Sequence, residues 1–332
     1  MPESKPERIA AVVVTYNRKS LLVESLDSLL RQSRPLDGLY IIDNASADGT
    51  YETLLDRGWI SAAERSADEP AETVRSVALP ASSAWQLEVH YIRMPQNTGG
   101  AGGFAEGMQR AAAAGFDWLW LMDDDLLTSL DALEMLVRKK DALEASRSEP
   151  FILNSLAIAR DQPDSEQLAF PLQELSARGG PKVRTYYWRL SQVRGLVKGG
   201  LYPWVCPFNG TFIPARITTE IGLPNKDFFI WGDEKDFLWR AARRFKLYTV
   251  VDSRVYHPPC RASVFDWRQY YNIRNMMVLN RYFRYRRLRN IKLILVSLVR
   301  GVRHGPWGLK LVLRAIRDGL AGRLGKRDDL LS

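Results

Sequence analysis

The sequence predicts an α/β fold with a mostly parallel sheet, followed by a helical C-terminal extension. In the first half of the 332 residues, continuous apolar runs that suit buried strands alternate with segments of helical apolar periodicity. In the last fifth, apolar residues are interleaved with many basic ones. We therefore expect a disordered lead at 1–8, one α/β domain at 9–265 and a basic amphipathic helical region at 266–332.

The composition favours an anionic partner. The net charge is +9 and the pI is about 9.5, which suits a nucleotide, an anionic membrane surface or a nucleic acid. Two cysteines, Cys206 and Cys260, make neither a disulfide framework nor a CxxC metal site, so we expect a reducing, cytoplasmic location. The N-terminus has no apolar signal region, and no apolar run reaches the ~20 residues that span a bilayer.

The first elements repeat a strand–helix unit. We expect strands at Ile9–Thr15 and Leu39–Asp43, a helix at Ser20–Gln32, and a short helix ending near Arg57. This alternation predicts right-handed crossovers between parallel strands. The next segment, 58–85, shows no clear periodicity and is interpreted as a surface excursion with at most a short helix.

Polar residues follow each early strand. Asn17 and Arg18 follow the first, Asp43 and Asn44 end the second, and an apolar run from Phe116 ends in Asp123, Asp124 and Asp125. Ligand sites in open α/β sheets lie at the carboxyl ends of strands. Adjacent acids are costly to bury unpaired, so a divalent metal carrying a phosphorylated ligand would suit them. The alternative is a solvated strand end that precedes a helix capped within Thr128–Asp131.

A glycine-rich stretch, Asn97–Phe104, follows an expected strand at Leu87–Arg93. Glycines let backbone amides approach an anion, and a helix beginning near Phe104 would point its N-terminus at the same place. The stretch lacks the ending of a P-loop, and a flexible turn is the alternative.

The middle of the chain is aromatic and punctuated by turns. Short strands are expected at Phe151–Ile158 and Val183–Leu190. The segment 204–214, which contains Trp204 and Asn209, suits a sugar ring, because aromatic faces meet its CH groups and amides meet its hydroxyls. A core strand with a turn explains it equally well.

A second acidic segment follows a run of aromatic residues. Asp233 and Glu234 come after Trp231 and Gly232 and open an expected helix that ends at Phe245. A carboxylate among apolar neighbours can have a raised proton affinity and act as a general base. Acids in a first helical turn are also favoured by the helix dipole alone. His257 follows a further strand, Tyr248–Asp252, and could reach the same rim.

Taken in order, seven segments resemble inverting nucleotide-sugar glycosyltransferases of the GT-A type, family 2, and most of all bacterial galactofuranosyltransferases. The resemblance covers about 9–280. The segments are TYNR (Thr15–Arg18), IIDNASADGT (Ile41–Thr50), NTGGAGGF (Asn97–Phe104), LMDDD (Leu121–Asp125), FFIWGDEKDF (Phe228–Phe237), YH (Tyr256–His257) and DWRQYYNIRN (Asp266–Asn275).

The resemblance implies a Rossmann-like GT-A catalytic domain at 9–265 and a role for each motif. Glu234 would be the catalytic base, although the family often has Asp there, so Asp233 stays an alternative. Mn or Mg would be the cofactor, held by Asp123, Asp125 and His257. The nucleotide sugar would be bound by Thr15, Asn17, Arg18, Asp43, Asn97, Asp123 and Asp124, and the acceptor or sugar by Gly102, Gly103, Trp204, Asn209 and Trp231.

The implied activity is metal-dependent, inverting transfer of a sugar to a hydroxyl of a saccharide or a lipid-linked saccharide in cell-surface glycan synthesis. The first choice of donor is UDP-galactofuranose. A rhamnosyltransferase or other hexosyltransferase of the same family is the alternative. From the residues alone, a nucleotidyltransferase or a nucleic-acid-binding module stays open, although no nucleic-acid recognition motif is apparent.

The C-terminal tail predicts contact with a membrane surface. Between Arg281 and Arg327 there are fourteen Lys or Arg residues and one acid, Asp318, interleaved with apolar groups. Such helices suit the inner face of the plasma membrane, where the acceptor would be a glycolipid. Alternatively, they pack on the catalytic domain or on another subunit of a homo-oligomer.

Overall fold

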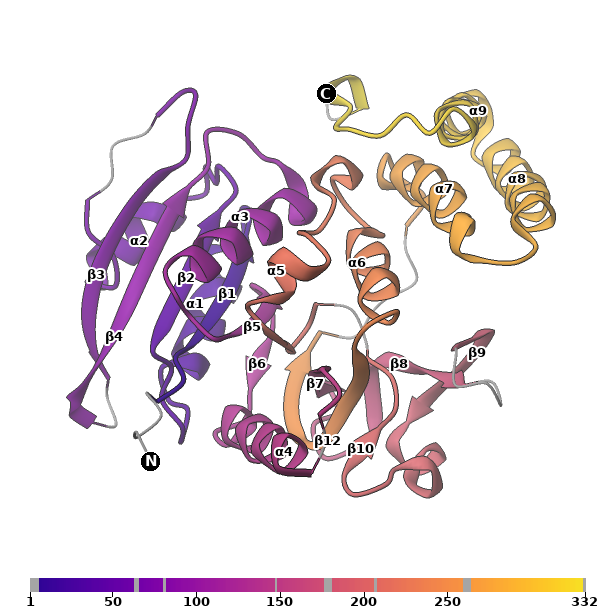
Figure 1. The fold of residues 1–332 in the computed structure, drawn as a ribbon. Coiled ribbons are helices and arrows are strands. Elements are labelled where there is room, and N and C mark those ends of the chain that lie inside the picture. The colour runs from indigo at the N-terminus through magenta and orange to yellow at the C-terminus, as the bar shows by residue number, and fades with distance from the viewer. Residues whose placement is uncertain are drawn as a thin grey trace.

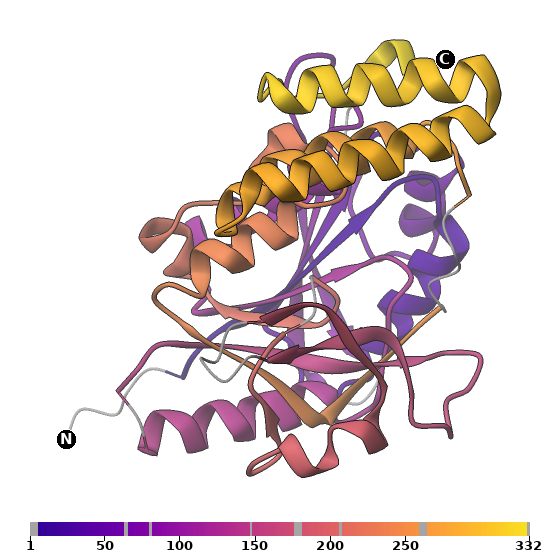
Figure 2. The ribbon, with the colours of Figure 1, turned by 90° about the vertical axis from the view of Figure 1, so that its right-hand side faces the viewer.

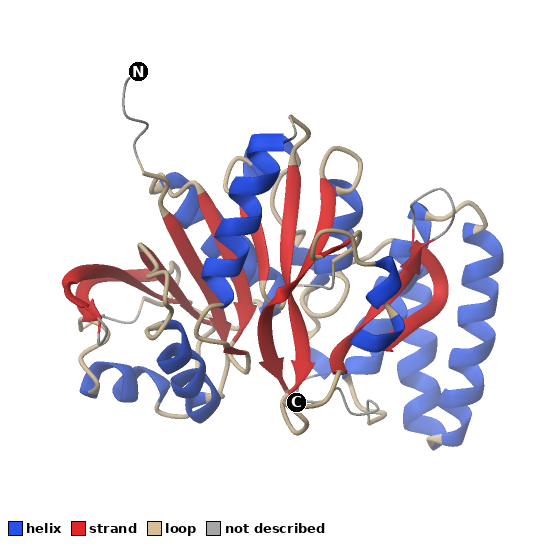
Figure 3. Cartoon of the chain, turned by 90° about the horizontal axis from the view of Figure 1, so that it is seen from below, coloured by secondary structure: helices blue, strands red, loops and turns tan. Residues whose placement is uncertain are grey.

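The structure is a computed structural model that describes residues 6–62, 66–79, 82–146, 148–175, 181–205, 208–258 and 264–330. Cys206 and Cys260 lie outside these ranges. A twelve-stranded sheet has the order β10-β12-β7-β11-β5-β1-β2-β4-β3, with β6, β8 and β9 attached beside it. Helices lie on both faces of the sheet (Figure 1, Figure 3), which confirms the α/β fold.

The N-terminal half of the sheet is parallel, as the sequence predicts. Strand β1 pairs in parallel with β2 and β5, and β2 pairs in parallel with β4. Alternate residues of β1 face two separate cores, because helices cover both faces. The elements are β1 (Ile9–Thr15), α1 (Lys19–Leu29), β2 (Gly38–Asp43), α2 (Thr50–Asp56), β4 (Ser82–Arg93), α3 (Gly99–Ala113) and β5 (Trp118–Asp123).

Most of the remaining pairs are antiparallel, so the sheet as a whole is mixed. Strand β11 runs antiparallel to both β5 and β7, whereas β12 and β7 are parallel. Strand β8 was not predicted. The elements are β6 (Leu127–Thr128), α4 (Ala132–Ser146), β7 (Phe151–Ala159), β8 (Gln167–Leu175), β9 (Pro181–Arg189), β10 (Leu201–Tyr202), β11 (Thr211–Pro214), α5 (Ile217–Glu220), α6 (Asp233–Ala241) and β12 (Lys246–His257).

The structure differs from the prediction in one segment of the first half. The segment expected to be a surface excursion contains β3 (Ala71–Leu79), an edge strand antiparallel to β4. Burial alternates along β3, but Arg75 lies on the partly buried side and Val74 on the exposed side, so the sequence lacks the apolar alternation that reveals a half-buried strand. At the start of the chain, the Arg8 backbone N–H donates to Asp117 at 2.8 Å.

The glycine-rich stretch lies inside a helix. Helix α3 begins at Gly99, not near Phe104, and its glycines allow close packing on the sheet. A Cβ at Gly103 would lie 2.5 Å from Val14, and one at Gly107 would lie 2.4 Å from Val12. These glycines bring the start of α3 directly over the ends of the central strands.

The C-terminal region forms three helices, α7 (Arg268–Leu279), α8 (Arg286–Arg303) and α9 (Gly305–Leu320). Helices α8 and α9 run side by side along one end of the molecule (Figure 2). Helix α7 shares a core with Phe229 of the α/β domain and with Leu311, Val312 and Ile316 of α9. The packing therefore continues across the predicted boundary at 265. No helix among the described residues is long and apolar enough to cross a bilayer.

Candidate active site

The polar residues that follow the early strands lie together at one edge of the sheet, as predicted. The parallel register places Thr15 opposite Asp43 and Val14 opposite Asp123, so the carboxyl ends of β1, β2 and β5 meet at one edge. Strand β6 pairs with the end of β12, with Tyr256 opposite Leu127. This pairing carries the end of β12 to the acids that follow β5.

Cationic and hydroxyl groups hold two of the three consecutive acids. Thr15 Oγ1 donates to Asp124 Oδ2 at 2.8 Å. Arg18 Nη1 donates to Asp125 Oδ2 at 2.9 Å and to Asp124 Oδ1 at 3.3 Å. His257 Nε2 lies 3.2 Å from Asp125 Oδ1. Five residues from three separate strand ends thus form one cluster, which we call the acid rim: Thr15, Arg18, Asp124, Asp125 and His257.

Burial and neighbouring charge shift the proton affinities in this cluster. Burial, followed by the charges of Asp125 and Asp124, raises the pKa of Asp123 to about 7. Burial raises the pKa of Asp124 to about 6, despite the opposing effect of Arg18. Burial alone would raise the pKa of Asp125 and lower that of His257, but their mutual contact reverses both shifts. Together with Asp123, three carboxyl groups meet two cationic side chains here, Arg18 and His257.

The donor set fits a hard divalent cation. Asp125 Oδ1 is buried and faces His257 Nε2 at 3.2 Å, and a carboxylate beside an imidazole suits Mg or Mn. The ligand atoms of Asp123, Asp125 and His257 do not all lie within 4.8 Å of one another. Asp125 and His257 therefore form the close pair, with Asp123 beside them.

In the part of the chain that the structure describes, one trio does meet that distance: Glu7, Asp141 and Glu144. It is exposed, and each of its carboxylates pairs with the ammonium group of Lys140. This trio serves as a set of ion pairs that fasten α4 to the start of the chain.

Several predicted nucleotide-binding residues make hydrogen bonds within the protein, as Asp43 and Asn97 show. Asp43 is fully buried and accepts hydrogen bonds from the Tyr91 hydroxyl at 2.6 Å and the Ser46 backbone N–H at 2.8 Å. Asn97 Oδ1 accepts from the Gly99 backbone N–H at 2.8 Å. Asn17 is more open, with a left-handed φ of 53°. Direct nucleotide contact by Asp43, Asn17 or Asn97 stays a prediction.

Sequence reasoning missed how Asn44 organises this edge. Its Oδ1 accepts hydrogen bonds from the Thr98 backbone N–H and hydroxyl, both at 2.9 Å. Its Nδ2 donates to the Gly99 carbonyl at 2.8 Å. Asn44 therefore ties the end of β2 to the start of α3. The only sequence signal was its position directly after a strand.

The second acidic segment lies across from the acid rim. Asp233 is buried, whereas Glu234 is partly exposed and accepts a hydrogen bond from the Gly232 backbone N–H at 3.1 Å. Burial, the charge of Glu234 and a hydrogen bond with Glu234 raise the pKa of Asp233 well above its ordinary value, and Asp123 adds to this shift. Each of these effects favours the protonated form of Asp233.

The predicted acceptor residues lie in different surroundings. Trp231 is 39% exposed, whereas Asn209 is buried with its Oδ1 lacking a hydrogen-bond partner. Trp204 packs edge-on against Trp239, with 5.8 Å between ring centroids. Gly103 faces the sheet, and a Cβ at Gly102 would meet the Thr98 side chain. These placements leave Trp231 as the aromatic side chain that is open to a sugar.

The fold and the site define a glycosyltransferase. The profile of glycosyl transferase family 2 matches residues 10–57 and 65–147. The galactofuranosyltransferase GlfT1 of Mycolicibacterium smegmatis is 30% identical over 264 residues, which are 78% of this chain and 73% of that protein. GlfT1 of Mycobacterium tuberculosis is 31% identical over 257 residues, 76% of this chain and 70% of that protein. The chain belongs to glycosyl transferase family 2.

A solved structure supports the GT-A fold. The mannosyltransferase PcManGT from Pyrobaculum calidifontis, in complex with GDP-Man and Mn2+, matches with a TM-score of 0.51 and 16% identity. The match covers 98% of this chain and 79% of that one. With the family established, the nucleotidyltransferase and the nucleic-acid-binding module are set aside.

Proposed function

We propose that this enzyme is a metal-dependent inverting transferase that moves galactofuranose from UDP-galactofuranose to a hydroxyl of a saccharide or lipid-linked saccharide acceptor in cell-surface glycan synthesis. The choice of sugar is supported by the names of the two mycobacterial relatives. The observation that carries the mechanism is that Asp123, which lies beside the acid rim, is within electrostatic reach of the Asp233–Glu234 pair.

On the donor side, Asp125 and His257 would hold Mn or Mg, with Asp123 beside them. Such an ion would supply charge stabilisation for a departing diphosphate. The solved structure of PcManGT is a complex with GDP-Man and Mn2+. His257 must release the proton on Nε2 to bind it. Arg18 lies against the same acids and would be free to pair with the diphosphate once the ion neutralises them.

On the acceptor side, Glu234 would be the base. Its partly exposed carboxylate can meet an acceptor hydroxyl, while Asp233 is buried and keeps its own proton. As Glu234 removes the proton, the hydroxyl oxygen attacks the anomeric carbon from the face opposite the diphosphate, which inverts that centre. Trp231 would supply an aromatic face to the sugar, and Asn209 an unpaired amide oxygen.

A panel of donors tests this proposal. The protein is incubated with UDP-galactofuranose, UDP-galactopyranose and dTDP-rhamnose, each with Mn and a saccharide acceptor, and the release of free nucleoside diphosphate is measured. We expect UDP-galactofuranose to be consumed fastest. Preferred consumption of dTDP-rhamnose would instead identify a rhamnosyltransferase of the same family. A protein that consumes none of the three would contradict the proposal.

We further propose that α8 and α9 hold the enzyme at an anionic membrane on the cytoplasmic face. One stripe of α8 is apolar, with each residue more than half exposed: Leu288, Ile291, Leu295, Val299 and Val302. Exposed basic residues accompany it on α8 and α9: Arg286, Arg287, Lys292, Arg300, Arg303, Lys310 and Arg317. An apolar stripe bordered by basic side chains matches an anionic lipid surface.

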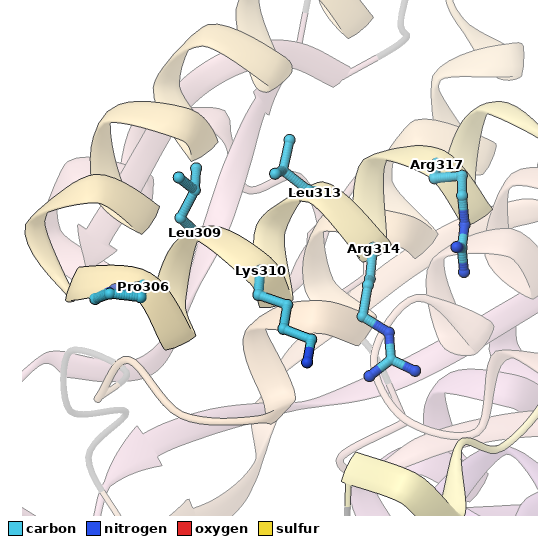
Figure 4. A pocket seen from close by; sticks show the side chains of 6 residues that line it. All are labelled: Pro306, Leu309, Lys310, Leu313, Arg314 and Arg317. Atoms are coloured by element: carbon cyan, nitrogen blue, oxygen red, sulfur yellow. The ribbon is translucent and has the colours of Figure 1, made fainter.

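Helix α9 also exposes both apolar and basic side chains. An open hollow of about 380 Å³ along it is lined by Pro306, Leu309, Lys310, Leu313, Arg314 and Arg317. Leu309 and Leu313 point to one side of the helix, and Lys310 and Arg314 point to the other (Figure 4). Helix α9 therefore carries apolar side chains on one side and basic side chains on the other.

Vesicle sedimentation at low salt tests the membrane proposal. We expect the intact chain to bind anionic vesicles less tightly as salt rises, and L295E to bind at least about tenfold less tightly. The matched control is L130E, because Leu130 is exposed to a similar extent far from α8. Equal sedimentation of the two variants would contradict the proposal, and loss of a dimer in L295E would indicate a homo-oligomer contact. Truncation before α8 would be a poor test, since α9 covers part of α7.

A further inference from the structure

The loop that leads into the candidate base is held in a strained conformation. Among the described residues, four that are not glycine have positive φ, and two of them, Phe229 at 66° and Trp231 at 59°, lie in this loop. Gly232 follows at 106°. Each such non-glycine residue costs of the order of 1–3 kcal/mol and persists only when its surroundings enforce it. Contacts with neighbouring segments must therefore hold this loop in place.

The amide of one α7 side chain meets three carbonyls of this loop. Asn275 is 1% exposed, and its Nδ2 lies 3.1 Å from the Phe228 carbonyl oxygen, 2.9 Å from that of Ile230 and 2.7 Å from that of Trp231. An amide nitrogen carries only two hydrogens, so the three carbonyls share them. All three carbonyls must converge on one point, which defines the path of the loop.

The neighbouring arginine completes this arrangement. Arg274 is fully buried, and its Nε donates to Asn275 Oδ1 at 2.9 Å, which orients the amide. Its Nη2 donates to the Phe228 carbonyl at 3.1 Å. The remaining carbonyl of the loop, that of Phe229, accepts from the Ala101 backbone N–H at 3.2 Å. Every carbonyl from 228 to 231 therefore has a donor from outside the loop.

We propose that Asn275, oriented by Arg274, is a positioning residue that sets Trp231 and Glu234 in place for the acceptor. The inference rests on the proposed function for the roles of Trp231 and Glu234. Neither α7 residue touches a reacting atom in this account. Asn275 acts through the carbonyls of Ile230 and Trp231, and Glu234 is fixed in turn by the Gly232 backbone N–H.

The test compares N275D with N272D. The first replaces an N–H donor with an anionic oxygen against three carbonyls, whereas Asn272 is a partly exposed residue on the same helix and serves as the matched control. We expect N275D to lower the transfer kcat by about 10- to 100-fold, with the Kd for UDP and Mn within twofold of the native value. N275Q, which keeps the donor, should recover part of the lost kcat.

A second readout does not depend on activity. Hydrogen–deuterium exchange of the peptide covering 228–236 should speed up in N275D relative to N272D, while peptides of β1 and β5 stay unchanged. If N275D does not fold, the same comparison is made with N275Q. Unchanged exchange in the loop, or an unchanged kcat in a folded N275D, would overturn the inference. A native protein that transfers no sugar would contradict the proposed function and leave the exchange result to decide the positioning role.

Discussion

The acids after β5 and the acids that open α6 lie within electrostatic reach of each other, yet their surroundings differ. Asp124 and Asp125 contact Arg18, and Asp125 also contacts His257. Asp233 instead has another carboxylate, Glu234, as its side-chain partner. The first site is built to hold negative charge opposite a cation, and the second is built to hold a proton.

This difference is the basis for expecting metal binding from the acids after β5 and proton transfer from the acids that open α6. A carboxylate beside cations stays ionised and can bind a metal, whereas a buried carboxyl beside a second acid retains its proton. Removing a cation ligand should therefore affect donor binding. Removing the base should affect proton transfer alone.

The largest expected effect is on the cation site. In D125A, the partner of both His257 and Arg18 is lost, together with the buried oxygen Oδ1 that faces His257. We expect transfer to fall by at least about 10³-fold, since charge stabilisation by a bound ion is worth several kcal/mol. Steady-state assays with Mn, and with excess chelator for the native enzyme, measure this. Full activity of folded D125A would remove the metal role.

The next effect separates the two acids at the start of α6. E234Q keeps the shape but cannot accept a proton, so kcat should fall by about 10²- to 10⁴-fold with donor binding nearly unchanged. D233N should cost less, because Asp233 already carries its proton. Kinetics of both variants decide the assignment. The reverse ranking would make Asp233 the base.

A smaller effect concerns metal affinity and pH. Protons on Asp123, whose pKa is about 7, and on His257, whose pKa is also raised, compete with the cation. The affinity for Mn should therefore weaken as pH falls from 8 to 6, by about tenfold over that range for the proton on Asp123 alone. Calorimetric titration at three pH values measures the slope. A pH-independent affinity would show that neither group is a ligand.

The smallest effect is on stability. A carboxyl whose folded pKa is raised stabilises the fold fully below its unfolded pKa, and this stability is lost as pH rises through the folded pKa. For Asp123 this window lies between about 4 and 7. D123N should therefore melt a few degrees above the native protein at pH 8, a gain of the order of 1 kcal/mol that vanishes near pH 4. A lower melting temperature of D123N at pH 8 would contradict a raised pKa of Asp123 in the folded protein.

The strand ends could be predicted because local pattern determines them. An apolar run that stops at Thr15 or Asp123 marks the end of a buried strand, and parallel crossovers bring such ends to one edge. The register confirms that these strand ends meet at one edge. The helical character of the basic tail was equally visible, since its apolar spacing is local.

What could not be predicted depends on contacts between distant segments. Asn275 meets the Ile230 and Trp231 carbonyls 45 and 44 residues away, and nothing in the local sequence encodes that meeting. The glycines of α3 suggested an anion loop because a pattern cannot distinguish exposed backbone from close helix–sheet packing. Strand β3 carries Arg75 on its partly buried side and Val74 on its exposed side, and so left no apolar alternation in the sequence.

Calorimetric titration of UDP in the presence of Mn, carried out on the native protein, D125A and E234Q, tests the central claim most directly. We predict that the native protein and E234Q bind with similar Kd values, while D125A binds at least about tenfold more weakly. If D125A binds like the native protein and E234Q does not, the roles of the two acidic sites are reversed and the account is wrong.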